Sequence, residues 1–111
     1  MNTLATTTVQ EQTVSIDETR MEHVQELRAE IARADQEIVG LLARRIALVR
    51  KLGGEKERCG LATADPAREA AVLRSVAASA RVAGLDEERV RELFWCVIEM
   101  SRSVQLRDSN S

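Results

Sequence analysis

Apolar residues recur every three or four positions from Glu22 to about Arg58, the spacing of one face of a long amphipathic helix. No proline interrupts this segment of about 37 residues, which as a helix would be roughly 55 Å long. Gly53 and Gly54 are weak points that either end the helix early or let a neighbour approach closely. The apolar stripe consists of Val24, Leu27, Ile31, Ile38, Leu41, Leu42, Leu48, Val49 and Leu52.

A second helix is predicted after a short loop. Asp65 is a typical N-cap residue, and Pro66 suits the first helical position because its φ is fixed and it lacks an N–H. This helix is expected to run to about Val82, with Gly84 as its C-terminal stop.

A third helix is predicted from Asp86, a further N-cap, to about Leu106. No strand pattern occurs, so the predicted fold is all-α: a three-helix protomer with one long N-terminal helix. A lone three-helix chain would expose much of the long apolar stripe. A second copy that lays its own long helix alongside would cover it, so we expect a homodimer.

The 111 residues suffice for one domain. The 16 basic and 18 acidic residues give a formal net charge of −2, and only 2% of residues are aromatic, which argues against nucleic-acid binding. No apolar run is long enough to span a membrane, and residues 1–20 lack a signal-peptide pattern. Two cysteines without metal-ligand or disulfide spacing fit a reducing cytoplasm.

The Thr- and Gln-rich residues 1–20 are expected to form a disordered N-terminal extension. The folded domain is then expected over 21–107, and residues 108–111 form a C-terminal tail.

Several polar residues fall on the predicted inward faces. Arg45 lies three residues from both Leu42 and Leu48, and other polar residues continue the stripes of the three helices. They are Arg28, Lys56, Arg68, Ser101 and Gln105. Burying four cations beside only two nearby carboxylates, Asp65 and Glu69, would be costly, so the cluster favours a small dicarboxylate ligand. Taken singly, each cation fits a snorkelling side chain at a helix edge; the set is harder to explain in that way.

Arg28 and Arg45 are 17 residues apart, or about 25 Å along a helix, so one chain cannot use both on one small ligand. If both act, Arg28 serves the site of the other protomer, and the dimer is part of the site.

In this order and spacing, these residues resemble the all-helical class of chorismate mutases, the type II domain. The pattern consists of Leu27-Arg28, Ala43-Arg44-Arg45, Lys56, Asp65-Pro66-Ala67-Arg68-Glu69, Ser101 and Gln105. The resemblance implies an interlocked homodimer with two equivalent sites that converts chorismate to prephenate, in aromatic amino acid or specialised aromatic biosynthesis.

The resemblance also implies roles for the carboxylate-binding residues. Arg28 from the partner chain and Arg45 would bind the substrate carboxylates, and Ser101 would touch the ring carboxylate.

The remaining implied roles concern the breaking bond and the ring hydroxyl. Lys56 and Gln105 would contact the ether oxygen, where negative charge develops in the transition state. Arg68 would order the site, while Glu69 and the backbone near Asp65 would hold the ring hydroxyl. The rearrangement is unimolecular, so no cofactor or metal is expected.

Three alternatives stay open. A 4-amino-4-deoxychorismate mutase and an isochorismate-pyruvate lyase share this fold, but in those relatives the residue after the loop arginine is apolar, whereas here it is Glu69. The third is an inactive helical interaction domain, which would have no need of buried cations. Some mutases of this class are activated by a larger shikimate-pathway enzyme, so such a partner is a further possibility.

Overall fold

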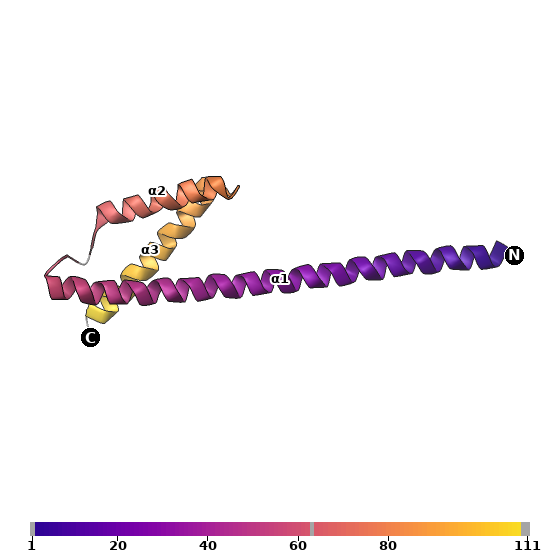
Figure 1. Cartoon of the computed structure of the whole chain (residues 1–111), viewed down its shortest axis with the longest axis horizontal. Helices are drawn as coiled ribbons and strands as arrows, with labels where there is room; N and C mark the ends of the chain where they lie inside the picture. Colours follow the sequence, from indigo (N-terminus) through magenta and orange to yellow (C-terminus); the bar gives the residue numbers. More distant parts are fainter. Residues whose placement is uncertain (1, 63, 110–111) are drawn as a thin grey trace. The chain divides into compact units, whose positions relative to one another are not determined.

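The computed structural model describes residues 2–62 and 64–109, and the side chains of residues 15–62 and 64–108. Over this part of the chain it contains three helices and no strand: α1 (Asn2–Cys59), α2 (Pro66–Val82) and α3 (Glu87–Ser109) (Figure 1). The predicted all-α fold with one long N-terminal helix is therefore confirmed, and α2 has the predicted bounds.

Helix α1 is longer than predicted. It begins at Asn2 instead of Glu22, so residues 2–20 are helical where a disordered extension was expected. No glycine or proline occurs before Gly40, so the strongest helix breakers are missing from this segment. The helix also continues through Gly53 and Gly54, which the sequence marked as weak points.

The C-terminal tail expected over 108–111 also differs in part. Helix α3 continues to Ser109, and residues 110–111 lie outside the described part of the chain. The boundaries of the folded domain at residues 21 and 107 stay a prediction.

Helices α1 and α2 end in the same way, each with a glycine in the left-handed conformation. Gly60 has a φ of 71° and Gly84 a φ of 75°. After α2, the Gly84 N–H donates to the carbonyl of Arg81, and the Leu85 N–H donates to that of Ala80. This Schellman pattern satisfies carbonyls that the helix end leaves unpaired, and it confirms Gly84 as the stop.

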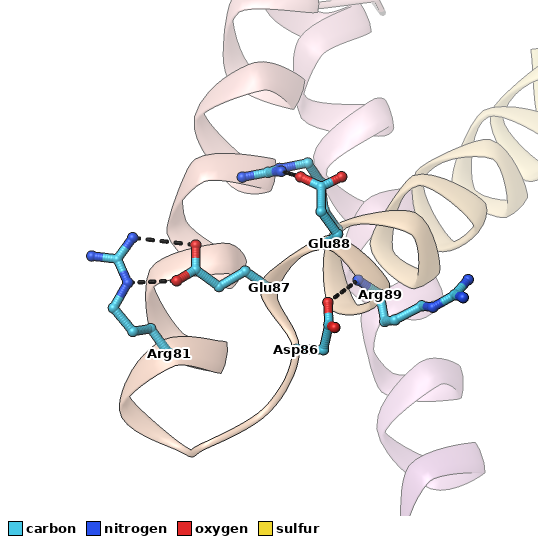
Figure 2. A network of polar contacts seen from close by, with 6 residues as sticks. Arg81, Asp86, Glu87, Glu88 and Arg89 are labelled. Carbon is cyan, nitrogen blue, oxygen red and sulfur yellow. Dashed lines mark hydrogen bonds and ion pairs between the residues drawn. The ribbon is translucent and has the colours of Figure 1, made fainter.

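The turn between α2 and α3 is fixed by polar contacts that Figure 2 shows from close by. Oδ1 of Asp86 accepts a 3.0 Å hydrogen bond from the backbone N–H of Arg89, which makes Asp86 the N-cap of α3 as predicted. Across the turn, Arg81 donates two hydrogen bonds to Glu87, from Nε at 2.5 Å and from Nη2 at 3.2 Å. These contacts join the end of α2 to the start of α3.

The chain divides into two compact units, Met1–Gly40 and Leu41–Ser111. The second unit holds the end of α1, α2 and α3, and α2 packs against α3 in an antiparallel hairpin (Figure 1). Its buried side chains are few and mostly small: Ala77, Ala80, Ile98, Ser101 and Val104. Val90, Phe94 and Val97 are half-buried, whereas Leu93 is exposed.

The apolar stripe of α1 is largely uncovered in the single chain. Ile31 is 60% exposed and Ile38 55%, and most other members of the stripe are exposed as well. A continuous apolar face of this kind is typical of a surface that another chain covers. None of the helices, as far as the chain is described, is long and apolar enough to cross a membrane.

Candidate functional site

A cavity of about 680 Å³ lies within the second unit. Its walls come from the end of α1, the loop before α2, the first turns of α2 and the second half of α3. Seven of the eight predicted site residues line it: Arg45, Lys56, Asp65, Arg68, Glu69, Ser101 and Gln105. The eighth, Arg28, belongs to the first unit, is exposed, and is not among the residues that line the cavity.

Helical spacing explains why several side chains of the same helix line the cavity together. On α1, Arg45, Val49, Leu52 and Lys56 follow at intervals of four, three and four residues, so they fall on one face. On α3, Ile98, Ser101, Arg102 and Gln105 follow the same rule. The helical period thus places both apolar and polar side chains on the faces that line the cavity.

The start of α2 supplies the loop side of the cavity. Oδ1 of Asp65 accepts a 3.0 Å hydrogen bond from the backbone N–H of Arg68, which caps the helix. Pro66 is the first helical residue, and Glu69 lies in the same first turn. The cap therefore fixes where Arg68 and Glu69 leave the backbone.

Arg45 of α1 contacts α3 through Ser101. Its Nη1 donates a 2.6 Å hydrogen bond to Oγ of Ser101, whose hydroxyl in turn donates to the carbonyl of Val97 at 3.0 Å. Ser101 is 6% exposed and Arg45 is half-buried. The arginine is thus held in place from one side, while it also lines the cavity.

Glu69 of α2 is paired with Arg102 of α3. Nε of Arg102 donates a 2.8 Å hydrogen bond to Oε2 of Glu69, and Nη2 donates to Oε1. The same guanidinium lies over the Trp95 ring, 5.3 Å from its centroid. These hydrogen bonds hold the pKa of the Glu69 carboxyl below its usual range, against the opposing effects of burial and of the Asp65 charge.

The cations are less buried than the sequence predicted. Lys56 is half-buried like Arg45, but Arg68 and Arg28 are exposed in the single chain. The reason for Arg68 is its place in the first turn of α2, next to an exposed loop. Arg28 lies on the uncovered face of α1.

Arg102 lines the cavity but was not among the predicted site residues. The helical spacing could have indicated this residue, since Arg102 lies four residues after Ile98 and three before Gln105 and so shares their face of α3. Helical spacing does not indicate that Arg102 pairs with Glu69, 33 residues away.

The charges around the cavity do not balance. Four cationic side chains, Arg45, Lys56, Arg68 and Arg102, line it together with two carboxylates, Asp65 and Glu69. This excess of two positive charges suits a small dianion, and the apolar floor of Leu48, Val49, Leu52, Val72 and Ile98 suits its hydrocarbon part. Among the described residues, no group of three or more His, Cys, Asp or Glu side chains is arranged to hold a metal ion.

Comparisons with known proteins show which family the chain is similar to. The sequence model of the family chorismate mutase type II matches residues 27–106. The T-protein of Haemophilus influenzae is 34% identical over 74 residues, which cover 67% of this chain and 20% of that protein. The chain thus spans about a fifth of the length of this curated relative. No solved structure matches the chain.

Proposed function

Since the chain belongs to the chorismate mutase type II family, we propose that it catalyses the rearrangement of chorismate to prephenate, and that it does so as a homodimer. The observation that carries the proposal is the cavity with an excess of two positive charges. Chorismate bears two carboxylates and a hydroxyl on a compact ring system, so its charge and size suit this site.

The proposed chemistry is one of positioning. The rearrangement is unimolecular, and the substrate has to be held in the compact conformer in which the new carbon–carbon bond forms as the carbon–oxygen bond breaks. Arg45 suits one carboxylate because its planar fork matches two carboxylate oxygens and Ser101 already restrains it. Arg68, in the first turn of α2, would help to order the substrate.

Lys56 and Gln105 are proposed to act on the ether oxygen of the breaking bond. Negative charge grows on that oxygen in the transition state, and fixed donors aimed at growing charge are a large source of catalysis. Both residues line the cavity from different helices, Lys56 from α1 and Gln105 from α3. Glu69 and the backbone near Asp65 would receive the ring hydroxyl, and Ser101 would contact the ring carboxylate.

The dimer is proposed from the uncovered stripe of α1. A second copy would bury apolar residues such as Leu27, Ile31 and Ile38, which are 45%, 60% and 55% exposed in the single chain. In this arrangement Arg28, which does not line the cavity of its own chain, would supply a cation to the partner's site.

Chorismate consumption, followed by ultraviolet absorbance, tests the proposal directly. Acid converts prephenate to phenylpyruvate, so the product of the mutase is distinguished from the salicylate of a lyase; the 4-amino analogue is assayed in parallel. We expect prephenate from the wild type and a loss of about 10²- to 10³-fold in Lys56→Ala. Arg89→Gln, which alters an exposed cation at the other end of α3, is the matched control. A wild-type protein that leaves chorismate unchanged would contradict the proposal.

A further inference from the structure

We propose that Arg102 is a positioning residue that acts through Glu69: it holds that carboxylate in one orientation so that it accepts a hydrogen bond from a hydroxyl group of the ligand. The inference rests on the proposed function, which assigns Glu69 to the ring hydroxyl. It adds a residue of α3 that does not itself need to touch the reacting atoms.

The first argument is the geometry of the pair. Two hydrogen bonds join the Arg102 fork to both oxygens of Glu69, with Nε on Oε2 at 2.8 Å. Such a two-point contact fixes the plane of a carboxylate as well as its distance, which a single hydrogen bond does not do. Of the two side chains Glu69 is the less exposed, 21% against 47% for Arg102, so the arginine is the more solvent-exposed partner of the pair.

The second argument is the support of Arg102 itself. Its guanidinium lies 5.3 Å from the centroid of the Trp95 ring, within the range of a cation–π contact. Trp95 precedes Arg102 by seven residues, or two turns of α3, so both side chains leave the same face of the helix. The ring therefore restrains a long side chain that would otherwise sample many rotamers.

The third argument is hydrogen-bonding capacity. An ionised carboxylate has about four lone-pair sites, and the Arg102 fork occupies two of them. A carboxylate can accept from a hydroxyl donor at the other two, so the ion pair and a ligand contact are compatible. Arg102 also offsets the negative charge of Glu69, which would otherwise repel a dianion in the same cavity.

Asp65, at the start of α2, is the other charge that acts on the Glu69 carboxyl, and it raises the pKa. Glu99 of α3 acts on Arg102, and further cations line the same cavity from α1 and the start of α2: Arg45, Lys56 and Arg68. Among the influences on the Glu69 pKa, the hydrogen bonds from Arg102 are the largest, and they lower it. Removing Arg102 should therefore raise the pKa of Glu69, and this gives a readout that a purely structural role would not move.

The test begins with the pH profile of kcat/KM for the wild type, Arg102→Gln and Arg102→Lys, with Arg89→Gln as control. We expect Arg102→Gln to lower kcat/KM by about 10- to 100-fold, and its acid limb to lie at higher pH than that of the wild type. Arg102→Lys keeps the charge but not the fork, so its loss should be intermediate. An unshifted acid limb in Arg102→Gln would overturn the inference.

The double variant shows whether Arg102 acts through Glu69. In the Glu69→Gln background, adding Arg102→Gln should lower kcat/KM less than about twofold, because the group on which Arg102 acts is already gone. Losses that multiply would mean that Arg102 works independently of Glu69, and would equally overturn the inference.

Carboxyl carbon-13 NMR keeps the inference separate from the proposed function. The Glu69 signal, assigned by its loss in Glu69→Gln, should titrate at lower pH in the wild type than in Arg102→Gln. Equal midpoints would refute the Arg102–Glu69 pair whether or not the wild type consumes chorismate. Inactivity of the wild type would instead refute the proposed function alone.

Discussion

Nη1 of Arg45 and Oγ of Ser101 lie 2.6 Å apart, although the two residues are 56 positions apart in the chain. The hydroxyl accepts from the guanidinium and donates to the carbonyl of Val97 one turn earlier in α3, and it can rotate to donate to a carboxylate oxygen instead. Toward Arg45 it acts only as an acceptor, because a guanidinium carries donors alone. This contact orients a cation of the cavity without neutralising it, which leaves the full charge for an anionic ligand.

Ser101→Ala should lower activity more than stability. The variant removes the acceptor of Arg45, and hydrogen bonds to charged groups contribute about 1.5–3 kcal/mol, so we expect kcat/KM to fall by about tenfold or more. The free energy of unfolding should fall by less, about 1 kcal/mol, because the half-buried Arg45 can donate to water instead and alanine is the better helix former. Steady-state kinetics and urea denaturation measure the two effects.

Ser103→Ala is the matched control. Its hydroxyl makes the same kind of bond within α3, to the carbonyl of Glu99 at 3.1 Å, but it is exposed and does not line the cavity. Kinetics that are equally impaired in both variants would show that the hydroxyl–Arg45 contact has no special role.

The Glu69–Arg102 pair should make stability depend on acid pH. The folded-state pKa of Glu69 is lowered from an ordinary value of 4.5, so its ionised form is favoured by folding. The resulting stabilisation is present above about pH 4.5 and is lost as the pH falls through the lowered pKa. Thermal unfolding should therefore show that Glu69→Gln lowers the Tm at pH 7 and has a much smaller effect near pH 3. A Tm difference that stays constant with pH would contradict this.

Activity should be nearly independent of pH between about pH 6 and pH 9. Gln105 carries no ionisable group, and the lowered pKa of Glu69 keeps its carboxylate charged throughout this range. Gln105→Glu provides the contrast: a carboxylate at the ether oxygen repels the growing negative charge unless it is protonated, so this variant should gain activity as the pH falls toward about 5. The pH dependence of kcat/KM, measured for the wild type and Gln105→Glu in one buffer series, tests this prediction.

A shared site should be visible by complementation between inactive chains. If Arg28 serves the partner, a mixed dimer of Arg28→Ala and Lys56→Ala contains one intact site, and random mixing should restore about a quarter of the wild-type activity. Arg45→Ala mixed with Lys56→Ala is the control, because both residues line the cavity of one chain and every site keeps a lesion. Failure of the first pair after verified subunit exchange would show that Arg28 does not act across the interface.

Gly84→Ala should destabilise the hairpin of α2 and α3. Gly84 has a φ of 75°, where an L side chain costs about 1–2 kcal/mol, although a Cβ would meet no atom within 4 Å. Urea denaturation at one fixed protein concentration measures the loss. Gly40→Ala is the control, since Gly40 lies within α1, its φ is not positive, and a Cβ there also meets no atom within 4 Å; this change should leave stability equal or higher.

Local features of the fold were predictable from the sequence. Asp65, Pro66 and Gly84 marked the ends of α2 correctly because caps and left-handed glycines depend on a few neighbouring residues. The predicted start of α1, Glu22, was wrong by 20 residues. A polar segment without glycine or proline contains no clear signal for where a helix begins. The periodicity also placed five polar residues on faces that line one cavity: Arg45, Lys56, Arg68, Ser101 and Gln105.

The tertiary structure alone decided which side chains pair. Ser101 was predicted to face inward, but not to restrain Arg45; Glu69 was predicted to be in the site, but not to be held by Arg102. Helical periodicity fixes the direction in which a side chain leaves its own helix. The distance between atoms on two helices depends on how those helices pack. No local sequence pattern indicates that packing for residues that are 33 or 56 positions apart.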